Sequence, residues 1–161
     1  MEGIRTFLIS SSSLETVSFG KRFGKKLRPG DVIALVGPLG SGKTTFAKGV
    51  ALGLGVKDED EVKSPTYVLV HQYQGKYLIY HLDLFRLGKI DEIEGIGWDD
   101  LLSNGAVILV EWADQVEGYL PKNYLQIEFK ISGETKREIS CQAFGEYYES
   151  LIQEVLREFK R

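Results

Sequence analysis

The sequence predicts an α/β fold of three layers, with a mixed central sheet between layers of helices. Apolar runs bounded by glycine or proline recur along the chain and indicate strands. Segments with apolar residues at every third or fourth position indicate helices that cover the sheet. Neighbouring runs joined by short glycine turns predict antiparallel hairpins within that sheet.

The N-terminal part of the chain predicts a strand followed by a helix. Residues 6–9 form a short apolar strand. Ser12 stands three residues before Glu15, which is the spacing of a capping box and marks the start of a helix. This helix is expected to run to about Leu27, because three apolar residues fall on one of its faces: Phe19, Phe23 and Leu27.

The next elements are a buried strand at 31–36, a glycine-rich segment and a helix at 45–53. The segment 37–44 fits the phosphate-binding pattern G-x-x-x-x-G-K-[ST] with no mismatch. Its glycines allow backbone N–H groups to surround a phosphate, and the helix N-terminus adds positive partial charge. Together, the strand, the glycine-rich segment and the helix predict a P-loop NTPase-like fold. The residues expected to bind the nucleotide are Gly37, Pro38, Leu39, Gly40, Ser41, Gly42, Lys43, Thr44 and Thr45.

Two of these side chains carry specific chemistry. Lys43 can reach the β- and γ-phosphates, and the Thr44 hydroxyl is placed to bind Mg²⁺. The alternative is a glycine-rich turn between a strand and a helix that binds no ligand.

The remaining elements complete the sheet and cover it. In order, we expect an exposed acidic connector (56–61), a hairpin (67–73 and 77–83, with a turn at 74–76), an irregular segment (84–97), a short helix (98–102), the most apolar strand (106–110), an alternating strand (124–131), a turn at 132–133, a returning strand (137–140) and a C-terminal helix. The apolar face of that helix is assigned to the core rather than to a partner: Leu151, Ile152, Val155, Leu156 and Phe159. No repeat or linker is seen, so residues 1–161 are expected to form a single P-loop domain.

Hydrolysis or transfer needs Mg²⁺ to neutralise developing charge, usually with a carboxylate at the end of a buried strand that helps to hold the ion. Two of the predicted strands end in a carboxylate. Glu111 follows five consecutive aliphatic residues, and Asp83 ends the second strand of the hairpin. Either carboxylate could instead pair with a nearby basic residue. His81 is expected to pack and hydrogen-bond within the hairpin. Arg86 could stabilise charge at the site or form an ion pair.

Composition excludes several classes of protein. The net charge is −3, so no broad basic surface for nucleic acid is expected, although a small local patch remains open. Cys141 is the only cysteine, which excludes an internal disulfide. No apolar run is long enough to span a bilayer, and no secretion signal is seen. We therefore expect a cytoplasmic protein without membrane contact.

Four motifs together resemble the TsaE (YjeE) family, bacterial ATPases required for threonylcarbamoyladenosine (t6A) synthesis on tRNA. They are the phosphate loop at 37–45, Ser-Pro-Thr-Tyr at 64–67, Tyr-His-Leu-Asp-Leu-Phe-Arg at 80–86 and Val-Glu-Trp at 110–112. The resemblance covers about residues 19–137. It implies that the single P-loop domain is an ATPase domain, with ATP and Mg²⁺ as cofactors.

The resemblance also implies roles for single residues. Thr44 and Glu111 would bind Mg²⁺, with Asp83 near the γ-phosphate or its attacking water. Trp112 would lie next to the site. A nucleotide-sensing, switch-like segment would comprise Ser64, Pro65 and Thr66, and Arg137 matches a recurrent arginine on the base side. Two positions depart from the family, namely Pro38 in place of Asp and Phe85 in place of Tyr.

The resemblance further implies a partner and a task. The protein would dock on the TsaB–TsaD pair and reset it between turnovers by ATP hydrolysis, weak alone and stimulated by these partners. It would reach tRNA through that complex. Two other functions remain open on the same scaffold: a small-molecule kinase, and a non-catalytic regulator that responds to bound nucleotide.

Overall fold

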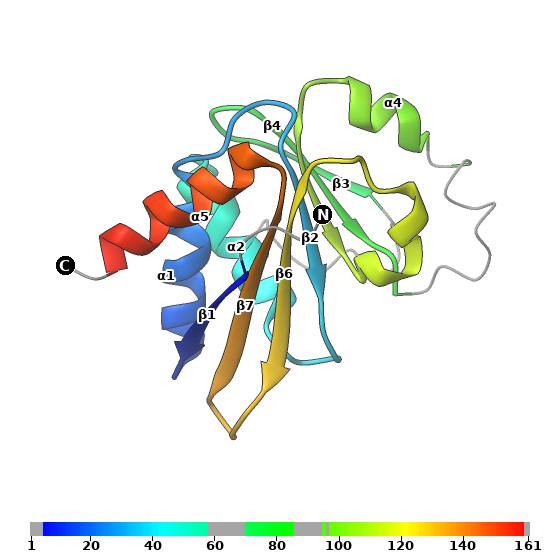
Figure 1. Cartoon of the computed structure of the whole chain (residues 1–161). Coiled ribbons are helices and arrows are strands. Elements are labelled where there is room, and N and C mark those ends of the chain that lie inside the picture. The colour runs from blue at the N-terminus through cyan, green and yellow to red at the C-terminus, as the bar shows by residue number, and fades with distance from the viewer. Residues whose placement is uncertain (1–4, 58–69, 86–94, 96, 160–161) are drawn as a thin grey trace.

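The computed structural model describes residues 5–57, 70–85, 95 and 97–159. Seven strands among these residues form one sheet in the order β1-β7-β6-β2-β5-β4-β3 (Figure 1). The strands are β1 (Arg5–Ser10), β2 (Val32–Val36), β3 (Val70–Gln74), β4 (Leu78–Asp83), β5 (Val107–Glu111), β6 (Tyr124–Ile131) and β7 (Arg137–Phe144). The helices within the described residues are α1 (Ser13–Gly24), α2 (Lys43–Gly53), α4 (Trp98–Ser103), α5 (Glu146–Phe159) and the 3₁₀ segment η2 (Ala113–Tyr119).

The sheet is mixed, as predicted. Strand β2 pairs in parallel with β5 and β6, and β5 pairs in parallel with β4. Two antiparallel hairpins, β3–β4 and β6–β7, extend this parallel centre, and β1 pairs antiparallel with β7 at one edge. The carboxyl ends of the central strands therefore meet at one edge of the sheet, beside the loop that follows β2.

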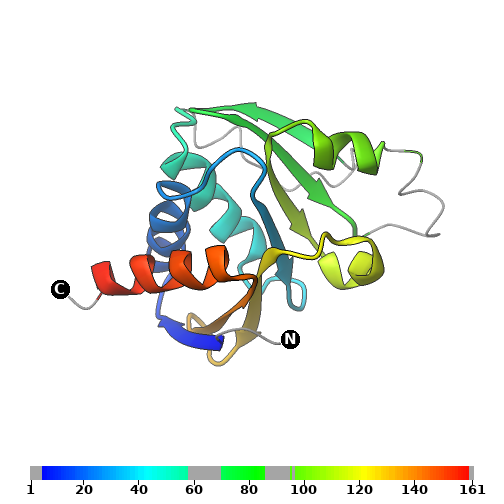
Figure 2. The same cartoon turned by 45° about the horizontal axis from the view of Figure 1, so that its top comes forward.

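Helices cover the two faces unequally. Helices α1, α2 and α5 lie together on one face, while α4 and η2 lie on the other (Figure 2). The core on the first face reaches from β3 to β7, and it includes the predicted side chains Leu151, Ile152 and Val155 of α5. The second core lies mainly over β2, β4 and β5. The sheet is thus the middle layer of a three-layer sandwich.

Helices α1 and α2 pack with their backbones in close contact. Each carries a Gly-x-x-x-Gly pair, and a Cβ atom at any of the four glycines would lie 2.1–2.2 Å from a backbone oxygen of the other helix: Gly20, Gly24, Gly49 and Gly53. This contact fixes α2 and therefore the loop that precedes it.

The start of α1 follows the prediction, and its end does not. The Ser12 side chain accepts a hydrogen bond from the Glu15 N–H at 3.1 Å, and the Glu15 carboxylate accepts one from the Ser11 N–H at 2.6 Å. The helix ends at Gly24 rather than near Leu27. The reason is a tightening of the last turn, in which Lys26 N–H donates to the Phe23 carbonyl at 2.9 Å.

Other boundaries also differ from the prediction. Strand β7 continues to Phe144 because it pairs with the whole of β6. The 3₁₀ segment η2 carries no strong periodic signal and was not predicted. Most of the acidic connector 56–61, the start of the hairpin before Val70 and most of the segment 84–97 lie outside the described residues. In the part that is described, no helix is long and apolar enough to cross a membrane.

Two tyrosines in the first turn of α5 form hydrogen bonds with the start of β2 and the residue before it. Tyr147 OH donates to the Asp31 carboxylate at 2.7 Å, and Tyr148 OH accepts a hydrogen bond from the Val32 N–H at 3.1 Å. The Arg28 N–H also donates to Asp31 at 2.7 Å. Burial nevertheless raises the pKa of the Asp31 carboxyl above its usual value, and these hydrogen bonds oppose that shift.

Candidate functional site

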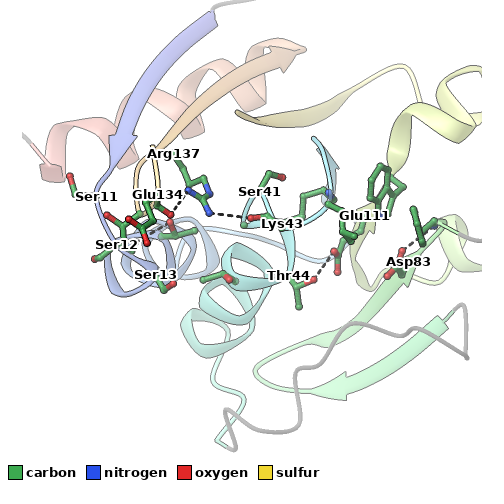
Figure 3. Close-up of a pocket in the computed structure, with 18 residues that line it drawn as sticks. Ser11, Ser12, Ser13, Ser41, Lys43, Thr44, Asp83, Glu111, Glu134 and Arg137 are labelled. Atoms are coloured by element: carbon green, nitrogen blue, oxygen red, sulfur yellow. Dashed lines mark hydrogen bonds between the residues drawn. The ribbon is translucent and has the colours of Figure 1, made fainter. Parts of the chain in front are cut away.

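A pocket of about 670 Å³ opens at the carboxyl edge of the central strands. We call residues 37–42, between β2 and α2, the glycine loop. The pocket lies over this loop, between the start of α1, the ends of β4 and β5, and the turn from β6 to β7 (Figure 3). Its walls are Ser11, Ser12, Ser13, Thr16, Leu39, Gly40, Ser41, Gly42, Lys43, Thr44, Thr45, Asp83, Phe85, Glu111, Trp112, Glu134, Thr135 and Arg137.

The glycine loop has a backbone that side chains would obstruct. Gly37 and Gly42 have φ values of 150° and 111°. A Cβ atom on Gly37 would lie 2.7 Å from the Phe129 carbonyl oxygen. Helix α2 begins at Lys43 without a side-chain cap, so its first N–H groups are available to a ligand. The buried Ser41 hydroxyl likewise has no hydrogen-bond partner among the described residues.

Lys43 folds back over its own loop. Its Nζ donates to the carbonyls of Gly37 at 2.6 Å and Pro38 at 2.9 Å, and it lies 3.9 Å from the centroid of the Trp112 ring. Burial lowers the pKa of Lys43, and the carboxylates of Glu111 and Asp83 partly offset this. Among the described residues, the direct contacts of this desolvated ammonium group are two carbonyl dipoles and a ring, so the group is suited to an anionic ligand.

Glu111 is the buried carboxylate at the end of β5, and only 2% of its surface is exposed. Its Oε1 accepts a hydrogen bond from the Thr44 hydroxyl at 2.7 Å, and its Oε2 lies 2.5 Å from His81 Nε2. The alternative that Glu111 pairs with Arg or Lys is therefore not what the structure shows. His81 packs within the hairpin as expected, with its ring centroid 6.0 Å from that of Tyr73 in β3, but its hydrogen bond reaches Glu111 of β5 instead of a residue of the hairpin.

Asp83 lies beside Glu111 because β4 and β5 are parallel and in register at these two residues. Its Oδ1 accepts a hydrogen bond from the Phe85 N–H at 3.0 Å, which turns the chain away from the strand. The structure thus brings together Lys43, Thr44, Asp83 and Glu111, as the sequence suggested.

Trp112 follows Glu111 with φ of 60°, the left-handed conformation that glycine favours. Among the described residues it is the one non-glycine residue with positive φ. The ring packs on Phe85 with centroids 4.8 Å apart and covers Lys43. Such strain is typical of functional sites, and here it aims the indole at the pocket.

One wall of the pocket was largely missed by sequence reasoning. It consists of Ser11, Ser12, Ser13 and Thr16 at the start of α1, together with Glu134 and Thr135 after β6. Arg137, known only as a family match, joins this wall and donates from Nη2 to the Gly40 carbonyl at 3.3 Å. The capping box was the available signal for α1, but nothing local places the β6–β7 turn beside a loop 97 residues earlier.

Other predicted residues lie elsewhere. Gly37 and Pro38 do not line the pocket but support Lys43 from behind, and they border a second pocket of about 310 Å³. The switch-like residues Ser64, Pro65 and Thr66 lie outside the described residues, as does Arg86.

Comparisons with known proteins agree with one another. The family model for the threonylcarbamoyl adenosine biosynthesis protein TsaE matches residues 10–139. The tRNA threonylcarbamoyladenosine biosynthesis protein TsaE of Bacillus subtilis is 42% identical over 144 residues, covering 89% of both chains. That of Treponema pallidum is 35% identical over 132 residues, which is 82% of this chain and 96% of the relative.

A solved structure gives the same result. The crystal structure of Bacillus subtilis YdiB superposes with a TM-score of 0.80 at 34% identity, and the match covers 98% of this chain and 97% of that one. The chain therefore belongs to the TsaE family of threonylcarbamoyl adenosine biosynthesis proteins.

Proposed function

We propose that this protein binds ATP with Mg²⁺ and hydrolyses it, and that hydrolysis resets the TsaB–TsaD pair between turnovers of t6A synthesis. The observation that carries the proposal is the contact between Thr44 and Glu111 beside the glycine loop. It joins the hydroxyl of the loop to a buried carboxylate on the neighbouring strand, which is the arrangement that phosphoryl-transfer sites of this class use for their metal.

The pocket suits a nucleoside triphosphate in size and polarity. A volume of about 670 Å³ lies within the range of small-molecule sites. The glycine loop, the start of α2 and Lys43 supply positive potential at one end, where the phosphates would lie. The other end, between Ser11 and Arg137, would hold the ribose and base.

The residues present also fit Mg²⁺. No group of three or more His, Cys, Asp or Glu side chains in the described part of the chain could hold a metal ion alone. Mg²⁺ needs no such cage, because it is commonly held by one or two protein oxygens with phosphate oxygens and water. Thr44 and Glu111 supply two oxygens 2.7 Å apart. Bound there, the ion would neutralise charge that develops on the phosphates.

The protein groups would divide the remaining work. Lys43 would leave the carbonyls of Gly37 and Pro38 and bind the β- and γ-phosphates. Asp83, next to Glu111 on the parallel strand, would orient the attacking water and accept its proton. Trp112 and Phe85 would close one side of the pocket and limit access of bulk water.

The test is steady-state ATP hydrolysis by the purified protein, alone and with the TsaB–TsaD pair, with Glu111→Ala and Lys43→Ala as comparison variants. We expect weak hydrolysis alone, stimulation by the pair, and loss of both in either variant. Far-UV circular dichroism should show that both variants fold.

Each other outcome has a definite meaning. Hydrolysis that the pair does not stimulate would refute the proposed partner while leaving the ATPase in place. Normal hydrolysis by a folded Glu111→Ala protein would refute the metal-binding role of Glu111. Transfer of labelled γ-phosphate to a small molecule would indicate a kinase, and no turnover under any condition would indicate a regulator.

A further inference from the structure

The end of α1 carries a concentrated basic surface in an otherwise acidic protein. Five of the 20 Lys and Arg residues of the chain stand in the eight positions 21–28, which contain none of its 23 Asp and Glu residues. We call these five residues the basic segment: Lys21, Arg22, Lys25, Lys26 and Arg28. Runs of this composition are typical of surfaces that bind nucleic acid.

In the folded protein these charged side chains lie at the surface, and the large apolar side chains between them are buried. Lys21, Lys25 and Arg28 are exposed, and Arg22 and Lys26 are half-buried. Phe23 and Leu27, the two large apolar residues of the same stretch, are buried in the core. The segment therefore presents cationic groups without an exposed apolar centre.

Local helix stability accounts for only part of this clustering. Lys21 and Arg22 stand in the last turn of α1, where cations are favourable. Lys25 caps the helix, and Lys26 and Arg28 lie beyond its end at Gly24. The stability of α1 therefore does not require cations at those later positions.

Among the described residues, counter-charge for the basic segment comes from Glu158 and, toward Arg28, from Asp31. Glu158 of α5 contacts both Arg22 at 3.6 Å and Lys26 at 3.3 Å, so one carboxylate serves two cations. The guanidinium of Arg28 lies over the Tyr147 ring at 5.5 Å. No ion pair to Lys21 or Lys25 is found within the described residues.

We propose that the basic segment binds the phosphate backbone of RNA directly, as a contact separate from the nucleotide pocket. A surface of exposed cations with its apolar residues buried matches a phosphate backbone better than a protein interface, which usually has an apolar or aromatic centre. The choice of RNA also rests on the tRNA-modifying family to which the chain belongs. The acidic remainder of the molecule would repel RNA and so orient it toward this one surface.

The location makes the contact compatible with ATP turnover. Residues at the start of α1 line the pocket, whereas the basic segment lies at and just beyond the C-terminal end of α1. The 12 residues of α1 span roughly 18 Å. Figures 1 and 2 show α1 next to α5 at the side of the molecule, so that one side of α1 faces away from the sheet.

The test is binding of an end-labelled tRNA transcript to the full chain, measured by fluorescence anisotropy between 50 and 200 mM salt. With about four phosphate contacts, each contributing about 0.9 to the slope, we expect affinity to fall about 150-fold across that range. The double variant Lys21→Glu, Lys25→Glu should bind at least about tenfold more weakly at 50 mM salt and show a slope shallower by about two.

Two further variants distinguish an effect of the basic segment on RNA binding from an effect of the protein's net charge. Lys122→Glu with Lys130→Glu makes the same change in net charge at two exposed lysines outside α1, and it should bind like the unmodified protein. Glu158→Gln removes the one carboxylate that Arg22 and Lys26 share, and it should tighten binding about threefold.

The proposal is overturned if tRNA is not bound at 50 mM salt, or if both double variants weaken binding equally. It is also overturned if Lys21→Glu, Lys25→Glu abolishes binding to the TsaB–TsaD pair while tRNA binding is absent, because the segment would then recognise an acidic protein. ATP hydrolysis measured on the same variants should be unchanged. Failure of RNA binding is thus distinguishable from failure of the proposed ATPase.

Discussion

Glu111 is held from two sides by other side chains of the protein. Thr44 contacts one carboxylate oxygen and His81 the other, and all three side chains come from different elements. His81 is fully buried, and its Nδ1 has no partner among the described residues. The imidazole can therefore act as a positioning group that keeps Oε1 of Glu111 turned toward Thr44.

This contact gives a prediction for His81. In His81→Leu the carboxylate loses one of its two contacts, so we expect the Mg²⁺ concentration for half-maximal ATP hydrolysis to rise about 10- to 100-fold, as is typical for groups that support a metal ligand. His81→Gln can still donate a hydrogen bond from a similar position and should restore most of the effect. The measurement is a Mg²⁺ titration of hydrolysis and of fluorescent-nucleotide binding for both variants.

A purely structural role for His81 would give a different result. Both variants would then lower the free energy of unfolding, by about 1–3 kcal/mol for a buried group left without its partner, and leave the Mg²⁺ dependence unchanged. Urea unfolding of the same proteins measures that effect.

At the scale of elements, the contact between α1 and α2 positions the glycine loop. A Cβ atom on Gly49 would lie 2.1 Å from the Val17 carbonyl oxygen, which is backbone and cannot move alone. The two helices would have to separate, and α2 carries Lys43 and Thr44 at its first turn. Packing of the helices and geometry of the site are therefore coupled.

We accordingly expect Gly49→Ala to be destabilising, although alanine is the better helix former. The steric cost should exceed the gain in propensity and lower the free energy of unfolding by about 1–3 kcal/mol, as for other overpacked sites. Gly118→Ala is the matched control, because nothing lies within 4 Å of a Cβ atom there. Thermal and urea unfolding measure both. A Gly49→Ala protein as stable as the control would mean that the helices can separate at little cost.

Local patterns were sufficient for most elements and for the chemistry of the glycine loop. The apolar run before Glu111 and the glycine spacing at 37–42 follow from backbone requirements that act over a few residues. The partner of His81 could not be predicted, because it depends on β4 lying beside β5. The pocket wall at 134–137 depends in the same way on the order of strands. That order is set by packing of the whole sheet, which no short window of sequence contains.

At the scale of the whole molecule, Cys141 lies at the centre of β7 and is fully buried between β1 and β6 in the sheet. Burial raises the pKa of its thiol to about 12, so the reactive thiolate is scarce in the folded protein. Reagents for thiols should therefore modify Cys141 only when the structure opens. Its labelling rate reports that opening.

Strand β7 connects Cys141 to the pocket, because it also carries Arg137, which lines the pocket. If labelling requires global unfolding, a ligand that binds only the folded state should slow it. ATP with Mg²⁺ at 100 times its Kd adds about 2.7 kcal/mol to the free energy of unfolding, which corresponds to about 100-fold slower labelling when opening and closing are fast. The measurement is the rate of reaction with a chromogenic disulfide, with and without nucleotide. Equal rates would show that β1 and α5 open locally around Cys141 while the glycine loop stays folded, so that the two halves of the sheet do not unfold as one cooperative unit.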